Sequence, residues 1–178
     1  MIRKFLHARA RKMGQHYNYD VSYMHGLIDI SPAAAIGLAR LPQFYKYRGP
    51  TAGQAVWIGA LLASTLEGDC GPCAQLVVDM ALEGGADPAC LQACAEGRPQ
   101  EAGAIGLGFR FAMMAITGDP LADDLRREIE SEFGKKAAVS CAFAAASGRI
   151  YPVLKRGLGH GQACMKLDFG GKVVKLAA

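Results

Sequence analysis

Helix-start signals recur along this chain in phase with its apolar runs, and they constrain the fold more than any other feature. Ser31-Pro32, Asp87-Pro88 and Asp119-Pro120 each precede such a run. A Ser or Asp side chain accepts a hydrogen bond from the free amides of a helix's first turn, and proline fits the first helical position. The pattern therefore predicts an all-α fold. Abundant Ala and Gly favour closely packed helices over β-strands.

Gly and Pro residues between the apolar runs place the expected helix ends. The expected helices cover residues 32–41, 52–65, 70–83, 88–95, 98–117, 120–133 and 135–154. Asp69 is the expected cap of the third of these helices, and Gly148 and Pro152 are expected to disturb the last. The tail predicts a short hairpin around Gly170-Gly171.

The length of 178 residues fits one domain. Within it we distinguish a basic helical extension over 1–50, a core over 51–134, and a C-terminal long helix and tail over 135–178 that pack on the core. The start of the chain predicts a basic amphipathic helix docked on the fold. The apolar residues expected on its docked face are Ile2, Phe5, Leu6 and Met13.

Charge is distributed unevenly behind a formal net charge of +4. Residues 1–50 hold eight Lys/Arg and two acids, residues 51–134 hold four Arg and thirteen acids, and residues 135–178 hold eight Lys/Arg and one acid. A nucleic-acid binder more often has one continuous basic face, so we expect no nucleic-acid partner. We expect the basic ends to wrap the acidic centre, within the chain or between subunits. An anionic membrane surface or an acidic partner is the alternative.

No secretory signal is recognisable, because the start of the chain lacks an apolar core segment. The apolar stretches 52–66, 102–117 and 137–147 fall short of the roughly 20 residues that a spanning helix needs. We therefore expect no membrane span and a cytoplasmic, reducing location. Arg110 interrupts one of these stretches. It is expected either to face solvent or to be buried with an acidic partner; the candidates are Glu67, Asp69 and Asp79.

The motif that carries chemistry is Cys70-Gly-Pro-Cys73 at an expected helix start. The helix dipole and free amides there stabilise a thiolate, and two sulfurs at this spacing can close a reversible disulfide. On dipole grounds Cys70 is expected to be the more acidic thiol. Glu67 and Asp69 would raise the pKa of a neighbouring thiol unless a cation neutralises them. Glu67 is either a solvated turn residue or a proton relay or substrate contact.

A metal site is the main alternative use of the cysteines. Cys70 and Cys73 are followed by Cys90 and Cys94, at a spacing near that of four-cysteine zinc sites. The segment between them predicts a continuous helix rather than zinc-ribbon turns. Core filling is therefore the better interpretation of the other cysteines, and we expect no bound metal and no cofactor. These cysteines are Cys90, Cys94, Cys141 and Cys164.

The four histidines are weaker candidates for a general base. His7 and His16 belong to the basic first segment and are expected at the surface. His25 and His160 lie in loop-like stretches, and a fold-back could bring either one to the cysteine pair.

Residues 51–117 resemble the carboxymuconolactone decarboxylase / AhpD-like superfamily. The resemblance rests on the order of elements in ALLASTLEGDCGPCAQLVVDMALEGGADPA: an apolar helix, the CxxC, an amphipathic helix, a Gly turn and Asp-Pro. It implies an all-helical bundle that assembles as a homo-oligomer, a trimer or hexamer. It also implies antioxidant peroxidase chemistry, in which Cys73 meets the peroxide and Cys70 completes the disulfide.

The chain departs from that family at two relay positions. The family has a His four residues after the second Cys, where this chain has Val77, and a Glu about three turns before the first Cys, where it has Ile58. We therefore expect a thiol/disulfide oxidoreductase or weak hydroperoxide-reducing protein that uses Cys70, Cys73 and Glu67. Its partner would be a thiol/disulfide protein or a small molecule. The alternatives are a non-catalytic or metal-holding member of the fold, and a decarboxylase-like enzyme acting on a small carboxylic acid.

Overall fold

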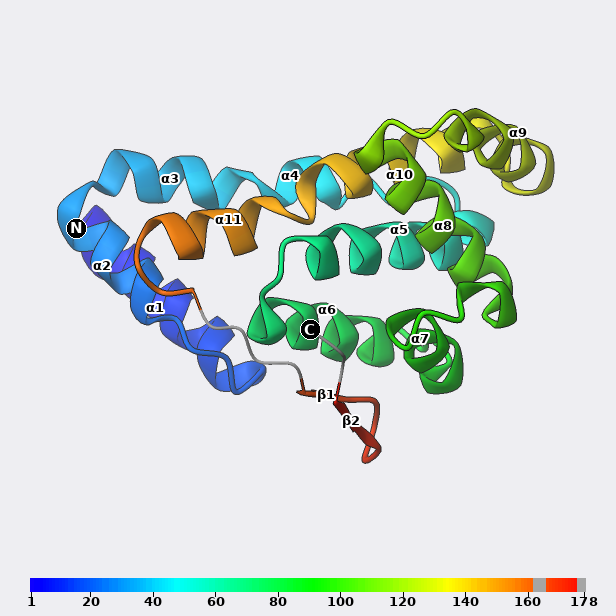
Figure 1. The fold of residues 1–178 in the computed structure, drawn as a ribbon. Helices are drawn as coiled ribbons and strands as arrows, with labels where there is room; N and C mark the ends of the chain where they lie inside the picture. The colour runs from blue at the N-terminus through cyan, green and yellow to red at the C-terminus, as the bar shows by residue number, and fades with distance from the viewer. Residues whose placement is uncertain (162–165, 176–178) are drawn as a thin grey trace.

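The structure is a computed structural model that describes residues 1–161 and 166–175, and it is mostly helical, as the sequence predicts (Figure 1). The elements are α1 (Ile2–His16), α2 (Ser22–Ile30), α3 (Pro32–Arg40), α4 (Pro42–Tyr45), η1 (Thr51–Gly53), α5 (Gln54–Glu67), α6 (Gly71–Glu83), α7 (Pro88–Ala95), η2 (Pro99–Glu101), α8 (Gly103–Thr117), α9 (Leu121–Phe133), α10 (Lys135–Ser147), α11 (Ile150–Gly157), β1 (Lys166–Asp168) and β2 (Val173–Lys175).

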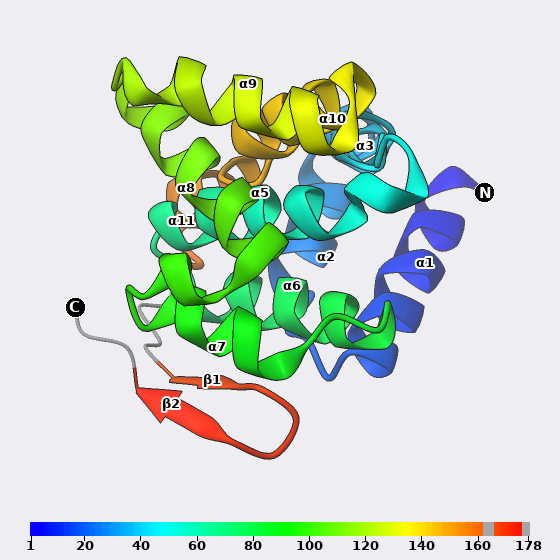
Figure 2. The same cartoon turned by 90° about the vertical axis from the view of Figure 1, so that its right-hand side faces the viewer.

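Helix α5 is the centre of the core. It is buried along most of its length and packs against α8 and α10 on one side and α6 on another (Figures 1 and 2). Glycines allow the closest of these approaches. A Cβ on Gly59 would overlap the carbonyl oxygen of Ile105 in α8, and a Cβ on Gly108 would overlap that of Val56 in α5. The two backbones are therefore in direct contact, which only glycine permits.

The first three helices form a separate lobe with its own apolar cluster (Figure 1). The sequence correctly predicts a docked basic helix, but it misjudges which face docks. Leu6 and Ala10, one turn apart on α1, are buried, whereas Ile2 and Phe5 are more than half exposed. Met13, the fourth residue expected on this face, is half-buried.

The Asp/Ser-Pro signals do start helices. Ser31 accepts a hydrogen bond from the amide of Ala34, and Asp87 accepts one from Ala89. Asp119 accepts one from Leu121 at the start of α9. These bonds satisfy first-turn amides that would otherwise lack a partner.

Two expected boundaries are wrong. Asp69 does not cap α6. The capping position falls on Cys70, while Asp69 has a left-handed backbone with a φ of 52° and its carboxylate pairs with Arg156. The helix expected from Arg98 begins later. A short 3₁₀ turn occupies Pro99–Glu101, and α8 starts at Gly103.

The expected long helix over 135–154 is divided near Gly148, where the sequence predicts a disturbance. Side chains of α5 bond to the backbone at this break. Pro152 has no amide hydrogen to bond the carbonyl of Gly148, and the hydroxyl of Thr65 donates to that carbonyl instead. The hydroxyl of Ser64 donates to the carbonyl of Ala145 and accepts from the amide of Arg149. Two side chains of α5 thus replace backbone bonds of the interrupted helix.

The tail hairpin is also confirmed, although residues 162–165 and 176–178 lie outside the described part of the chain. Strands β1 and β2 pair antiparallel, and Gly170 and Gly171 both have positive φ in the turn (Figure 2). Leu167 is buried in an apolar cluster that includes Val78 of α6 and Leu91 of α7. The side-chain amide of Gln75 in α6 both donates to and accepts from the backbone of Asp168.

Charges meet across the segments at a few places only. Arg149 pairs with Glu67 at 3.1 Å and Arg156 with Asp69 at 3.3 Å, so the basic C-terminal segment does contact the acidic centre. His16 contacts Glu83 from the other basic end.

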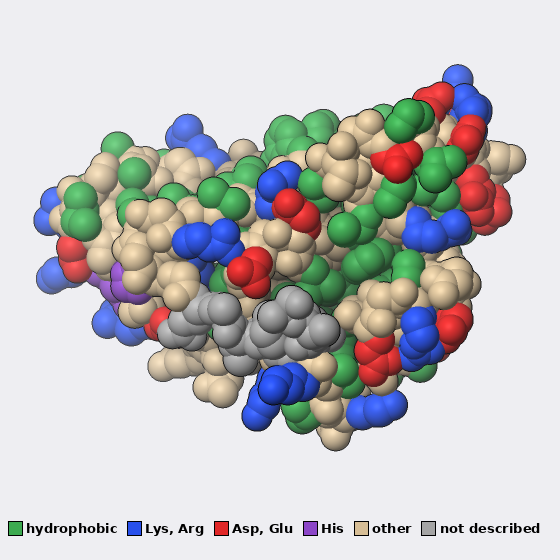
Figure 3. Space-filling view, viewed as in Figure 1, with side chains coloured by type: hydrophobic (Ala, Val, Ile, Leu, Met, Phe, Trp, Pro, Cys, Tyr) green, Lys and Arg blue, Asp and Glu red, His purple; other side chains and the backbone are tan. Residues whose placement is uncertain are grey.

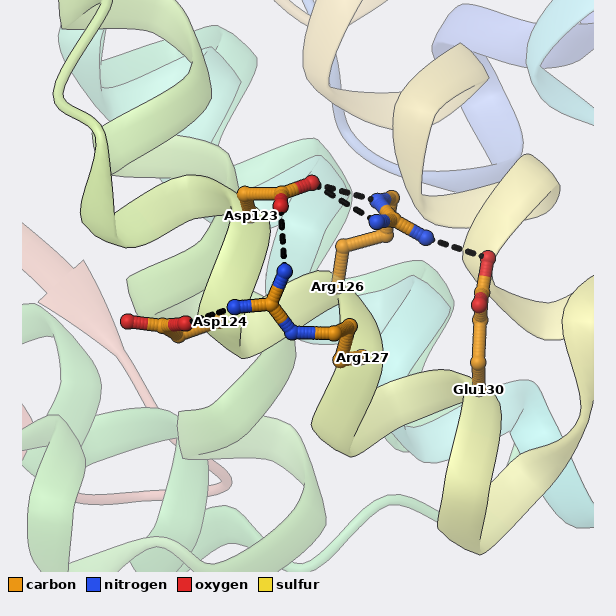
Figure 4. A network of polar contacts seen from close by, with 5 residues as sticks. All are labelled: Asp123, Asp124, Arg126, Arg127 and Glu130. Carbon is orange, nitrogen blue, oxygen red and sulfur yellow. Dashed lines mark hydrogen bonds and ion pairs between the residues drawn. The ribbon is translucent and has the colours of Figure 1, made fainter.

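Many acids of α9 are instead satisfied within their own helix. They gather at the α9 end of the face in Figure 3, where Asp123, Asp124 and Glu130 pair with Arg126 and Arg127 (Figure 4). Exposed pairs of this kind contribute little to stability, because solvent screens the two charges.

Within residues 1–161 and 166–175, one helical stretch is long and apolar enough to cross a membrane by length and composition. It is Lys135–Gly157, and half of its most apolar window is buried inside the protein. A core helix of a water-soluble protein passes the same test, so this feature supports neither location.

Candidate functional site

Cys70 and Cys73 lie at the N-terminal end of α6, where Gly71 and Pro72 form the first helical positions. Their sulfur atoms are 2.8 Å apart, and each residue is only 4 % exposed. The left-handed backbone at Asp69 turns the chain sharply out of α5 and brings both sulfurs to the same side of the helix start. The sulfurs are therefore placed to exchange a proton or to form a disulfide with little movement.

The pKa values of the two thiols are shifted in opposite directions. The hydrogen bond between the two sulfurs lowers the pKa of Cys70 below its usual value, and the nearby charges of Lys155 and Arg156 act in the same direction. The same interaction with Cys70, followed by burial, raises the pKa of Cys73. Cys70 is therefore the more acidic thiol of the pair, the order that the helix dipole predicts.

Cys73 forms part of the wall of an apolar cavity of about 350 Å³, whereas Cys70 is not part of the lining. The cavity lies where the lobe of α1–α3 meets α5, α6 and α11. Leu6, Met13, Leu27, Leu61, Val77 and Met80 provide apolar walls. A cavity of this size accommodates a small organic molecule, and Cys73 is the sulfur that such a molecule would meet.

Two tyrosines add polar groups near Cys73. The hydroxyl of Tyr19 is 3.5 Å from its sulfur, and burial strongly raises the pKa of Tyr19. Tyr23 is 1 % exposed and lines the same cavity, and its hydroxyl has no hydrogen-bond partner among the described residues. A buried hydroxyl without a partner is costly, so it is available to a molecule in the cavity.

Lys155 of α11 packs over both tyrosines. It is 1 % exposed, and its Nζ is 4.9 Å from the ring centre of Tyr19 and 5.2 Å from that of Tyr23. The sequence reasoning missed these three residues. The one sequence feature that bears on Lys155 is the short amphipathic helix around it. A lysine in such a helix usually faces solvent, so this feature points away from a buried site.

Glu67, the third predicted site residue, points elsewhere. Its carboxylate contacts the guanidinium of Arg149. Glu67 is not among the described residues that line the cavity. The structure gives it the surroundings of a surface ion pair and no contact with either sulfur.

The histidines form other contacts in the described part of the chain. His7 and His25 are joined by a 2.6 Å hydrogen bond between their Nδ1 atoms, and His7 also bonds Asp29. His16 contacts Glu83 at the surface. The ring of His160 lies 6.4 Å from that of Tyr23 and 3.5 Å from the hydroxyl of Ser22. The prediction of a histidine base on the cysteine pair is therefore not borne out by these contacts.

The remaining cysteines do not join the pair. Cys94 and Cys141 are buried in the core, where burial raises the pKa of each to about 12, and Cys90 is half-buried beside Asp87. Cys164 lies outside the described residues. Among residues 1–161 and 166–175 no three His, Cys, Asp or Glu side chains come together as a metal-binding group, so the four-cysteine zinc alternative gains no support.

Arg110 was expected to face solvent or to bond an acid. It is half-buried, and its Nε has no hydrogen-bond partner within the described part of the chain. The expected partners are engaged elsewhere: Glu67 with Arg149, Asp69 with Arg156, and Asp79 with Gln75.

The fold and the site together define a class: an all-α protein in which a buried CxxC pair borders an apolar cavity. No family model, curated protein or solved structure matches this chain.

Proposed function

We propose that this protein is a thiol/disulfide oxidoreductase whose working group is the Cys70–Cys73 pair. The observation that carries the proposal is that the two sulfurs have different surroundings. Cys73 lines an apolar cavity, and Cys70, whose sulfur is 2.8 Å from that of Cys73, has a lowered pKa. A thiolate is both the nucleophile and the base in disulfide exchange, so this arrangement suits a dithiol that reduces an apolar disulfide.

The exchange runs in two steps. Cys73 attacks one sulfur of the substrate R–S–S–R′, a Cys73–S–R bond forms as the S–S bond breaks, and the proton of Cys73 passes to Cys70 and then to the departing R′–S⁻. Cys70 then attacks the sulfur of Cys73, so that the intramolecular disulfide forms as R–S⁻ leaves and takes a proton from water. Two protein thiols are oxidised to one disulfide, and the substrate is reduced to two thiols.

The AhpD-like resemblance extends the proposal to a homo-oligomeric protein and to organic hydroperoxides as weaker substrates. The positions of the family's relay groups favour disulfides over hydroperoxides here. Val77 lines the cavity and Ile58 packs in the core, so neither can move a proton. A hydroperoxide needs a proton delivered to its departing oxygen, whereas a disulfide releases a thiolate that leaves readily without one.

Equilibration with a series of reduced and oxidised glutathione, read by mass spectrometry after acid quenching, tests the proposal. The expected result is a reversible loss of two hydrogens between residues 70 and 73. Cys73→Ser and Cys70→Ser should abolish that couple, whereas the matched variant Cys90→Ser should keep it. A pair that stays reduced throughout the series, or a couple that survives Cys73→Ser, would show the proposal to be wrong.

The pH dependence of labelling tests the order of acidity. Because a thiolate reacts and a thiol does not, and because the pKa of Cys70 is lowered, its alkylation by iodoacetamide should reach a plateau below the usual thiol pKa of about 8.5. Cys73→Ala removes the hydrogen bond that is the main cause and should move the inflection to higher pH. Peptide mapping of the adducts across a pH series measures both, and an inflection that is the same in both proteins would contradict the assignment.

A further inference from the structure

Lys155 has no task in the proposed exchange. Its side chain is almost completely buried, at 1 % exposure, and packs on Tyr19, whose hydroxyl contacts Cys73. Within the described residues no carboxylate forms an ion pair with its Nζ. The charge of Asp20 interacts with Lys155 from farther away, and the acidic side chains nearby have other hydrogen-bond partners. Asp20 is bonded by Ser22, and Asp69 by Arg156. A buried ammonium without an anion is expensive, and proteins seldom keep one that has no function.

The groups around Lys155 narrow down what its charge can act on. The rings of Tyr19 and Tyr23 present their faces to Nζ, which offsets part of the lost hydration. Burial raises the pKa of both tyrosines, so they stay neutral and cannot serve as its anion. Tyr19 in turn contacts Cys73. Of the buried groups around Lys155, the cysteine pair is therefore the one that can lose a proton and become negatively charged.

We propose that Lys155 is the counter-charge of the Cys70–Cys73 dithiol and a positioning residue that sets its reduction potential. The inference rests on the proposed function. A positive charge beside the pair stabilises the reduced form, which contains a thiolate, and leaves the neutral disulfide unaffected. Stabilising the reduced form raises the potential and makes the disulfide more oxidising. Lys155 would thus keep the pair from being trapped as a disulfide.

The surroundings of its neighbours explain why Lys155, and not another side chain of this segment, acts on the sulfurs. Its neighbour Arg156 reaches the carbonyls of Gly68 and Asp69 from the solvent side, so its charge is partly spent on the turn that precedes Cys70. His160 follows on the same segment, and its amide donates to the carbonyl of Lys155. Lys155 is the buried one of these three residues, and its charge lowers the pKa of both cysteines. A buried charge acts with little screening.

The test measures the glutathione equilibrium of the pair in wild type, Lys155→Met and Lys155→Arg. Methionine matches the length of lysine without its charge, and replacing a buried charge by an apolar residue is commonly tolerated. Lys155→Met is expected to shift the equilibrium toward the disulfide by about tenfold, which is about 30 mV for a two-electron couple. The inflection of Cys70 alkylation should rise in the same variant. Lys155→Arg keeps the charge and should stay close to wild type in both readouts.

Lys136→Met, at an exposed position of α10, is the matched control for loss of one positive charge and should change neither readout. An unchanged couple in a folded Lys155→Met overturns the inference and leaves the oxidoreductase intact. If Lys155→Met does not fold, Lys155→Arg decides: a couple shifted as far as tenfold with the charge retained also overturns it. Absence of any couple in the wild type would instead overturn the oxidoreductase itself.

Discussion

Alanine at Gly59 or Gly108 is expected to disrupt the packing of α5 against α8 severely. Each Cβ would overlap a backbone carbonyl of the facing helix, and backbone cannot turn aside as a side chain can. Alanine in a helix gains about 1 kcal/mol over glycine from intrinsic propensity. Overpacking at a rigid contact costs about 1–3 kcal/mol or more, so the clash should prevail and α5 and α8 should separate.

Chemical unfolding of the two variants measures this effect, with Gly37→Ala as the matched control. Gly37 lies within α3, and a Cβ there meets nothing within 4 Å, so its variant should be as stable as the wild type or slightly more stable. We expect Gly59→Ala and Gly108→Ala to lose a large share of the unfolding free energy or to accumulate as insoluble protein. Wild-type stability in either one would mean that α5 and α8 do not approach as closely as described.

Most helices of this protein could be predicted because their signals are local. A capping side chain, a proline at the first position and a terminal glycine act within one turn, and Ser31, Asp87 and Asp119 all act in this way. The geometry at Asp69 could not be predicted in the same manner. An aspartate before a CxxC has the sequence of a cap, but the turn from α5 into α6 needs a left-handed residue at that place.

The candidate site could be predicted only in the part that is contiguous in sequence. Cys70 and Cys73 are recognisable from their spacing, but the groups around them come from distant segments. Tyr19 and Tyr23 precede the pair by about fifty residues and Lys155 follows it by about eighty. Only the packing of α11 and of the N-terminal lobe against α6 brings them together. Glu67 is the converse case: it is close to the pair in sequence, yet its carboxylate is bonded to Arg149.

Closing the cavity from its rim should stop bulky substrates from reaching Cys73 while leaving the cysteine pair intact. Ala39 suits this purpose, because it belongs to the lining and is nevertheless exposed on α3, far along the chain from the cysteines. Ala39→Trp adds a large ring at the entrance without filling the core. The expected result is that reduction of a bulky aromatic disulfide slows by about 100-fold, the scale on which apolar pockets reject a poor fit.

The comparison that gives this result its meaning is between substrates and between sites. A small aliphatic disulfide should be slowed far less by Ala39→Trp, and the glutathione equilibrium of the pair should not change. Ala33→Trp places the same ring on an exposed position of α3 that is not part of the lining, and it should slow neither substrate. If Ala39→Trp slows both substrates equally, the rate is limited at the sulfurs themselves and not by passage through the cavity. If it slows neither, bulky disulfides reach Cys73 by another path, and the cavity has no part in selecting them.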